Sequence, residues 1–446
     1  MTRAPERDGS FRYDSYRLEP EHDRLVCRYT LGPRRFEERI SFDPGGDWSS
    51  PAVDATARLV HLLAGVSYFK TAAPPRIDLG ELPTTPGERH FLRSFYLNGL
   101  AEFAYRNDVD LSGLRVDGPD RTVAEPAAYE PEPASPLIPF GGGIDSIVTA
   151  EHTRAGFPGA ALFVVSGREG RFDAIERPAA LTGLPVLRAE RAIDTQLLGG
   201  TGRGFLNGHV PVTGIISAIA VMAAVLARRD AVVMSNEWSA SSANLTLAGR
   251  PVNHQYSKSL EFEEGFRRVL AGALGGTPGF FSLLRPFSEL WVARRFAELP
   301  RYHHAFRSCN RAFRLDRSQR LDRWCGVCDK CCFIDLILSP FLDATVLRDV
   351  FDGSEPLDQP ALAERFRALL GTSPANKPFE CVGDVGECRT ALLLAAARPD
   401  RCGSAQLLAM AGEVRDAGGA PEGIDHLRPM GEHFVPDEYS AEDQLV

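Results

Sequence analysis

Short apolar runs alternate with helical stretches along the middle of this 446-residue chain. A run of about 4–8 apolar residues is typical of a strand buried on both faces. Such strands separated by helices predict an α/β fold, a doubly wound parallel sheet covered by helices on both faces. The expected strands are 137–140, 161–165, 185–187 and 231–234, and the expected helices are 147–155, 176–181 and 213–227.

Composition and periodicity divide the chain further. The first part has two alternating segments, 25–30 and 35–42, and two helical segments, 52–70 and 88–106, which predict a small α+β domain. A stretch rich in Pro, Ala and Glu follows, and it lacks periodicity, as a linker does. The predicted parts are an N-terminal domain (1–118), a linker (119–136), the parallel-sheet domain (137–339), a helical C-terminal region (340–430) and an acidic tail (431–446).

Charge and hydropathy limit the partners of the chain. The net charge is −9, so an overall positive field for nucleic acid is not expected. The first thirty residues carry charges throughout and lack the apolar segment of a signal peptide. Residues 210–227 are mostly apolar, but Pro211 and Gly214 favour a buried helix over a membrane span, which needs about 20 apolar residues. We expect a cytoplasmic protein with no nucleic-acid or membrane partner, and its oligomeric state is open.

A glycine-rich loop lies where the first predicted strand meets a helix. Gly141, Gly142 and Gly143 let backbone N–H groups approach an anion, and the helix N-terminus adds about half a positive charge. Ser146 can donate a hydrogen bond to phosphate, and Asp145 can hold a metal ion or a loop amide. The spacing is a poor dinucleotide fingerprint, and the chain has no acceptable G-x-x-x-x-G-K-[ST] loop. The alternative is a glycine turn that only joins strand to helix.

Two further groups of polar residues are candidates for the same site. Asn236 and Glu237 directly follow a predicted strand, and ligands of open α/β sheets bind outside the carboxyl ends of strands. If a helix begins one residue before His254, then Lys258 and Glu261 share its face. That face would carry a base, a cation and a carboxylate. The alternative is a solvated helix face whose charged row is incidental.

Four cysteines have the spacing of a metal site, C-x15-C-x2-C-x2-C. They are Cys309, Cys325, Cys328 and Cys331. Thiolates two residues apart on a tight turn can bind one ion, and four of them close a tetrahedral zinc shell. The alternatives are an iron–sulfur cluster, a redox dithiol or reduced thiols in a core. The remaining cysteines are expected to be buried thiols: Cys27, Cys332, Cys381, Cys388 and Cys402.

Several motifs together resemble one family. The loop resembles the S-G-G-x-D-S motif of the PP-loop ATP pyrophosphatases, with Gly141 in place of the serine. The whole set is similar to the ATP-dependent UDP-N-acetylmuramoyl-L-alanyl-L-glutamate epimerases of bacterial cell-wall synthesis. Ile144 stands where this family is expected to have lysine. The motifs are GGGIDS at 141–146, SNE at 235–237, VNHQYSKSLE at 252–261, SCN at 308–310, WCGVCDKC at 324–331 and KPFECVG at 377–383.

The resemblance implies an isomerase whose substrate is the small-molecule UDP-muramoyl dipeptide and whose cofactors are ATP and Mg²⁺, beside a structural Zn²⁺. Residues 137–339 would be a PP-loop nucleotide-binding catalytic domain. Adenylation of the glutamyl α-carboxylate, with conversion of ATP to AMP and diphosphate, would remove its charge and make the α-proton easier to abstract. The implied roles are pyrophosphate binding by Gly141, Gly142, Gly143 and Ser146, metal or loop binding by Asp145, charge stabilisation by Lys258, proton transfer by His254 or Glu261, and lining of the crevice by Asn236 and Glu237.

Two other functions stay open from the sequence. One is another PP-loop enzyme that adenylates its substrate and then ligates or amidates it, such as a deazaguanine-synthesising or tRNA-modifying enzyme. The other is a nucleotide-binding regulator without catalysis, for which Ile144 and the missing loop serine are the hints.

Overall fold

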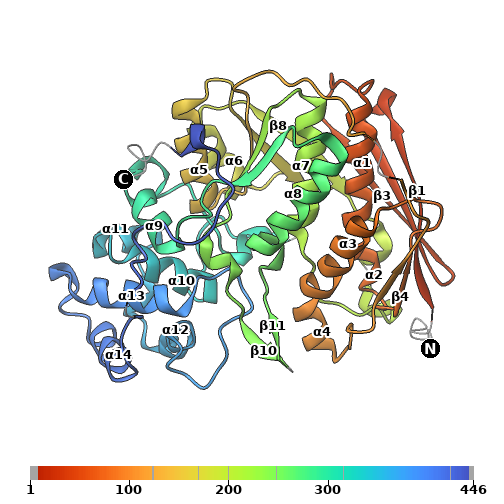
Figure 1. The fold of residues 1–446 in the computed structure, drawn as a ribbon. Coiled ribbons are helices and arrows are strands. Elements are labelled where there is room, and N and C mark those ends of the chain that lie inside the picture. The colour runs from red at the N-terminus through yellow and green to blue at the C-terminus, as the bar shows by residue number, and fades with distance from the viewer. Residues whose placement is uncertain are drawn as a thin grey trace.

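One ten-stranded sheet organises the chain in the computed structural model (Figure 1). The order of its strands is β12-β9-β6-β7-β8-β3-β2-β1-β4-β5. A separate hairpin pairs β10 (Leu245–Leu247) with β11 (Arg250–Val252). The structure describes residues 9–122, 125–168, 170–198, 200–247, 249–314, 316–421 and 423–440.

Five neighbouring strands of the large sheet are parallel. They are β6 (Leu137–Pro139), β7 (Ala161–Ser166), β8 (Val186–Ala192), β9 (Ala231–Met234) and β12 (Gly279–Ser282). The first four confirm the predicted strands, whereas β12 was not predicted. Because β7 and β8 lie on one side of β6 while β9 and β12 lie on the other, the strand order reverses between β6 and β9. In doubly wound sheets this switch point is where ligands bind.

Helices cover both faces of the parallel strands, as predicted. Alternate residues of a strand point to opposite faces, and on β7 Leu162 packs in one hydrophobic core while Phe163 packs in the other. The first core includes residues of α5 (Ile144–Gly156), α6 (Asp173–Thr182) and α9 (Glu289–Ala297). The second core includes residues of α7 (Val212–Leu226) and α8 (Leu260–Leu274). Within the described ranges, no helix is long and apolar enough to cross a membrane.

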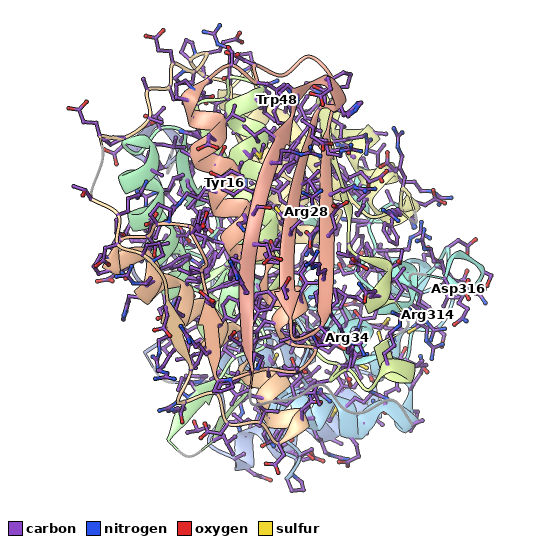
Figure 2. The ribbon with its side chains drawn as sticks, turned by 90° about the vertical axis from the view of Figure 1, so that its right-hand side faces the viewer. Tyr16, Arg28, Arg34, Trp48, Arg314 and Asp316 are labelled. Carbon is purple, nitrogen blue, oxygen red and sulfur yellow. The ribbon has the colours of Figure 1, made fainter. Side chains whose placement is uncertain are left out.

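The N-terminal residues extend the same sheet. β1 (Ser10–Glu19), β2 (Arg24–Leu31) and β3 (Arg34–Phe42) form an antiparallel meander, and β3 pairs antiparallel with β8. The meander confirms the two alternating segments and adds β1. Figure 2 looks onto its outer face, where Arg28 is exposed and pairs with Glu37 at 2.9 Å. The ranges predicted as two domains therefore share one sheet, and their independence as folding units stays a prediction.

The rest of the N-terminal range lies beside the parallel half. α1 (Pro51–Ala64) packs on α7 (Figure 1). The other elements of this range are α2 (Val66–Phe69), β4 (Arg76–Asp78), α3 (Pro86–Gly99), α4 (Ala101–Asn107) and β5 (Arg115–Asp117). In the predicted linker, the Tyr129 hydroxyl donates to the carbonyl oxygens of Ala224 (3.0 Å) and Arg229 (2.8 Å). This segment is therefore tied to the end of α7.

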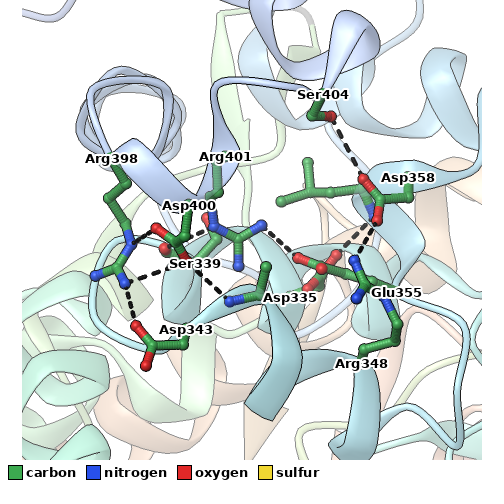
Figure 3. A network of polar contacts seen from close by, with 12 residues as sticks. Asp335, Ser339, Asp343, Arg348, Glu355, Asp358, Arg398, Asp400, Arg401 and Ser404 are labelled. Atoms are coloured by element: carbon green, nitrogen blue, oxygen red, sulfur yellow. Dashed lines mark hydrogen bonds and ion pairs between the residues drawn. The ribbon is translucent and has the colours of Figure 1, made fainter.

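The C-terminal region is helical, as predicted. Its helices are α11 (Ala344–Val350), α12 (Ala363–Leu370), α13 (Val385–Ala396) and α14 (Ala405–Asp416), and they pack beside α10 (Asp329–Leu338), which ends the preceding range. Figure 3 shows the polar network that fixes the end of α10. Buried Arg401 donates to Glu355 Oε1 (2.5 Å) and to the Ser339 carbonyl (3.2 Å). In the predicted acidic tail, Tyr439 stacks on Phe157 with 4.1 Å between ring centroids, and residues 441–446 lie outside the described ranges.

Candidate active site

A cavity of about 460 Å³ opens at the switch point between β6 and β9. Seven residues predicted for the site line it: Gly141, Gly143, Asp145, Ser146, Asn236, His254 and Lys258. Gly142 and Glu237 are buried. Glu261 lines two neighbouring cavities instead. The structure thus brings nearly all of the predicted site together, although its residues come from separate segments.

The glycine loop is shaped for a close approach of backbone to ligand. Gly142 has φ +76°, and a Cβ there would lie 2.3 Å from the Ala174 carbonyl oxygen, so only glycine fits. Gly143 is the N-cap of α5, and because glycine has no side chain, no side-chain hydrogen bond caps this helix. Ser146 Oγ donates to the Gly143 carbonyl (3.0 Å). Ile144, which replaces the expected lysine, is buried in the core, so its side chain makes no polar contribution to the cavity.

Three carboxylates meet behind the loop. Asp145, Glu237 and Glu289 each offer an oxygen within 4.8 Å of the others. Both Glu237 oxygens, Asp145 Oδ1 and Glu289 Oε2 are buried and have no hydrogen-bond partner among the described residues. Burial, and then the charge of Glu237, raise the pKa of Asp145 to about 7. Unpaired carboxylates at this density suit a divalent cation such as Mg²⁺, which binds oxygen ligands.

Cations face these carboxylates. Lys330 Nζ lies 3.8 Å from Glu289 Oε1. Burial lowers the pKa of Lys258, but Cys381, Glu237 and Asp145 together raise it above its usual value. Sequence reasoning missed Lys330, although it lies within the cysteine motif.

Arg307 was also missed. It lines the cavity and is 4% exposed. Its Nε and Nη2 are buried and lack a hydrogen-bond partner in the described part of the chain. Burial lowers the pKa of this guanidinium. A buried guanidinium with unused donors at a cavity wall is suited to bind an anionic oxygen.

Arg285 holds two of the site segments in place. This fully buried side chain is paired with Glu263 at 3.0 Å. It also donates to the carbonyl oxygens of Glu237 (2.7 Å) and Lys258 (2.5 Å). The segment after β9 and the segment before α8 are therefore joined through one guanidinium.

The predicted helix across His254, Lys258 and Glu261 is wrong. Residues Tyr256–Lys258 form a short 3-10 helix (η5), and α8 begins only at Leu260. Ser259 caps α8 by accepting a hydrogen bond from the Phe262 N–H (3.2 Å).

The side chain before His254 explains this local structure. Asn253 Oδ1 accepts from the Gln255 N–H (2.8 Å), which forms a turn rather than a helix. His254 and Lys258 consequently face the cavity, while Glu261 Oε1 accepts from Asn98 Nδ2 (3.0 Å) outside it.

His254 is part of a chain of polar contacts. Its Nδ1 lies 2.5 Å from Glu102 Oε2, and its imidazole is also hydrogen-bonded to Cys381. Burial lowers the pKa of His254, but these two contacts raise it to about 9. The ring of His209 lies 4.2 Å from that of His254, centroid to centroid. Glu102, His209 and Cys381 were not predicted for the site, although Cys381 lies within a quoted motif.

The four predicted cysteines converge. Their Sγ atoms are 4.0 Å apart between Cys309 and Cys328, 3.6 Å between Cys325 and Cys331, and 3.4 Å between Cys328 and Cys331. Sulfurs bound about 2.3 Å from a tetrahedral zinc stand about 3.8 Å apart, so the geometry fits this ion. Cys328 is the N-cap of α10, and Lys330 is the second residue of this helix. The cysteine turn thereby aims Lys330 at the carboxylates.

The fold and cavity define an α/β protein with a glycine-rich loop, buried carboxylates and buried cations at the switch point of its sheet. Family models match as the MurL N-terminal domain over residues 2–283 and the MurL C-terminal domain over residues 305–422. The chain therefore belongs to the MurL family.

Three relatives share the name UDP-N-acetyl-alpha-D-muramoyl-L-alanyl-L-glutamate epimerase. The protein from Salinispora tropica is 40% identical over 87% of this chain and 85% of its own. The protein from Xanthomonas oryzae pv. oryzae is 39% identical over 84% of this chain and 83% of its own. That from Micromonospora sp. is 37% identical over 97% of both chains. No solved structure matches the chain significantly.

Proposed function

We propose that this enzyme epimerises the terminal L-glutamyl residue of UDP-N-acetylmuramoyl-L-alanyl-L-glutamate during peptidoglycan precursor synthesis, and that it uses ATP to do so. The relatives named as epimerases support the reaction. One observation carries the use of ATP: the glycine loop, Asp145, Lys258 and Arg307 line a single cavity. We assign a PP-loop ATPase fold to this half of the sheet on the same ground.

The loop binds the phosphates in this proposal. Backbone N–H groups of Gly141, Gly142 and Gly143 and the N-terminus of α5 face the pyrophosphate, as does Ser146. Lys258, Lys330 and Arg307 supply positive charge, and Asn236 lines the nucleotide crevice.

The residues that would hold Mg²⁺ are Asp145, Glu237 and Glu289, because their unpaired oxygens converge. When bound, the ion would offset phosphate charge.

Adenylation makes the proton transfer feasible. An oxygen of the glutamyl α-carboxylate attacks the α-phosphorus of ATP, and pyrophosphate leaves. The carbonyl group of the acyl-adenylate is uncharged, so removal of the α-proton gives an enolate. Removal of the same proton from the free carboxylate would place a carbanion next to an existing negative charge. Each pKa unit gained at the α-carbon is worth about 1.4 kcal/mol. Protonation on the opposite face and hydrolysis then release the D-glutamyl product and AMP.

Of the two proton carriers that the sequence suggested, His254 lines the cavity and Glu261 does not. Of these two residues, only His254 is therefore placed to support the proton-transfer step, either directly or by positioning another group.

The cysteine cluster is proposed to hold a structural zinc ion. Its sulfur spacing fits four ligands, which leaves no open coordination position for chemistry. We place the enzyme in the cytoplasm, where ATP and UDP-linked precursors are available and thiols stay reduced.

The test follows hydrogen at the glutamyl α-carbon. The protein is incubated with ATP, Mg²⁺ and the UDP-muramoyl dipeptide in D₂O, and deuterium incorporation and AMP are measured together. Both are expected. AMP without deuterium would favour an adenylating ligase or amidotransferase, and neither would favour a nucleotide-binding regulator.

The variant Asp145→Ala should abolish AMP formation, because it removes a carboxylate beside the phosphates. Asp349→Ala on the exposed face of α11 is the matched control and should keep full activity. Normal AMP formation by Asp145→Ala would refute the assignment of that residue.

A further inference from the structure

One cysteine that lines the cavity has no role in the mechanism above. Cys381 precedes α13 and lines the same cavity as Gly141, Asp145 and Lys258. Its backbone carbonyl accepts a hydrogen bond from Lys330 Nζ, which fixes the segment at the cavity wall. A nucleophilic or basic sulfur is thus held beside the proposed phosphate site rather than in an apolar core.

Cys381 is the end of a three-residue relay. Its side chain is hydrogen-bonded to His254, whose Nδ1 lies 2.5 Å from Glu102 Oε2. The three residues come from the segment before α13, the segment before η5 and helix α4. Glu102 is itself 4% exposed and also accepts from Arg106 Nε (2.6 Å). The carboxylate therefore orients the imidazole, and the imidazole orients the sulfur.

The surroundings favour the thiolate. Burial would raise the pKa of Cys381, but Lys258, the hydrogen bond from His254, and Lys330 together lower it to about 6. Burial lowers the pKa of His254, but its contacts with Cys381 and Glu102 raise that pKa to about 9 and so keep the imidazole protonated. A protonated imidazole that donates to both neighbours has no lone pair with which to accept a proton. Of the two, the sulfur is the base.

We propose that Cys381 is the catalytic base that removes the α-proton of the adenylated glutamyl residue on one face, with His254 and Glu102 as positioning residues. This inference rests on the proposed function. The C–H bond breaks, its proton forms S–H on Cys381, and its electron pair enters the enolate of the acyl-adenylate. The enolate takes a solvent-derived proton on its other face, and the thiol returns its proton to water.

Two variants separate this role from a structural one. Cys381→Ser keeps size and hydrogen bonding but lacks an accessible anion, and Cys381→Ala removes both. Each should still release AMP with ATP and the UDP-muramoyl dipeptide, while α-deuterium incorporation in D₂O falls about 10²–10⁴-fold. Cys402→Ser, at an exposed cysteine, is the control and should match the unaltered protein in both assays.

A second readout compares the two epimers. Loss of α-deuterium to light water is measured from the L- and from the D-glutamyl substrate. A base that serves one face predicts that Cys381→Ser slows one of these exchanges far more than the other. A merely structural defect slows both alike, and equal slowing would overturn the proposal.

The outcomes distinguish the two levels of inference. If the unaltered protein fails to exchange the α-hydrogen, the proposed function itself is refuted. If the unaltered protein exchanges the α-hydrogen and the Cys381→Ser variant exchanges it at a rate within about tenfold of that, only the role of Cys381 is refuted. Loss of AMP release by both variants at an unchanged melting temperature would also refute it, because Cys381 would then act in adenylation. If both variants unfold, iodoacetamide labelling of the unaltered protein decides, since exchange that survives complete labelling of Cys381 would overturn the proposal.

Discussion

Glu102 Oε2 lies 2.5 Å from His254 Nδ1, although 152 residues separate the two in sequence. Glu102 belongs to α4 in the N-terminal range, and His254 to the segment that precedes η5. The N-terminal residues therefore do more than extend the sheet: they supply the carboxylate that orients a cavity-lining imidazole.

Replacement of Glu102 by glutamine tests this contact. The variant Glu102→Gln keeps a hydrogen-bond acceptor but removes the negative charge, so the pKa of His254 should fall below about 9. We expect AMP release to persist and epimerisation to drop by about 10–10²-fold. The pKa is measured by NMR titration of the imidazole. Glu264→Gln, which removes an exposed partner of Arg268 on α8, should change neither quantity.

Two adjacent glycines of the loop should respond differently to alanine. Gly142→Ala places a Cβ 2.3 Å from the Ala174 carbonyl oxygen at φ +76°, whereas a Cβ at Gly141 meets no atom within 4 Å. Gly142→Ala should lose about 1–3 kcal/mol of unfolding free energy and most ATP turnover. Gly141→Ala should fold normally. Urea denaturation and AMP release measure both effects, and equal stability of the variants would contradict the loop geometry.

Metal analysis tests the cysteine cluster. The purified protein should carry one zinc ion per chain, and its removal by a chelator should destabilise the fold by at least about 3 kcal/mol. Cys328→Ser should lose the metal, while Cys402→Ser should keep it, because Cys402 is exposed and outside the cluster. Mass spectrometry of bound metals and thermal unfolding are the measurements. Iron with a visible absorption band would favour the iron–sulfur alternative, and a metal-free, equally stable protein would exclude both.

Acid sensitivity of the N-terminal core should depend on His61. This side chain is 1% exposed and lies between the rings of Tyr13 (5.1 Å) and Tyr29 (4.9 Å). Burial lowers its pKa from 6.5 to about 3. Between pH 6.5 and about pH 3, His61 is protonated in the unfolded chain but neutral in the folded protein. The free energy of unfolding is therefore unaffected by His61 above the upper pKa and decreases as the pH falls toward the lower one.

The variant His61→Leu removes this dependence. Between pH 7.5 and pH 5.0 the unaltered protein should lose about 1–2 kcal/mol more unfolding free energy than His61→Leu. His22→Leu, at an exposed position, should decline like the unaltered protein. Parallel declines in all three proteins would show that His61 does not titrate as its burial requires.

Local patterns predicted the parts of this protein. The alternation of apolar runs and helices determined the parallel strands, the glycine loop after β6 and the helix that follows it, because hydrophobic period and backbone freedom are properties of adjacent residues. Cysteine spacing likewise gave the four converging thiols, whose separation along the chain limits how far apart they can lie.

Only the tertiary structure decided which segments meet. The helix expected across His254 was replaced by a turn because Asn253 and Ser259 offer competing side-chain caps, and this separated Glu261 from the cavity. Glu102, Arg307, Lys330 and Cys381 joined the site through packing of helices and loops on the sheet, and no local period encodes such contacts. The sequence by itself determined the loop and the sheet that carries it; the charges around that loop were decided by long-range packing, where burial strengthens each ion pair and hydrogen bond.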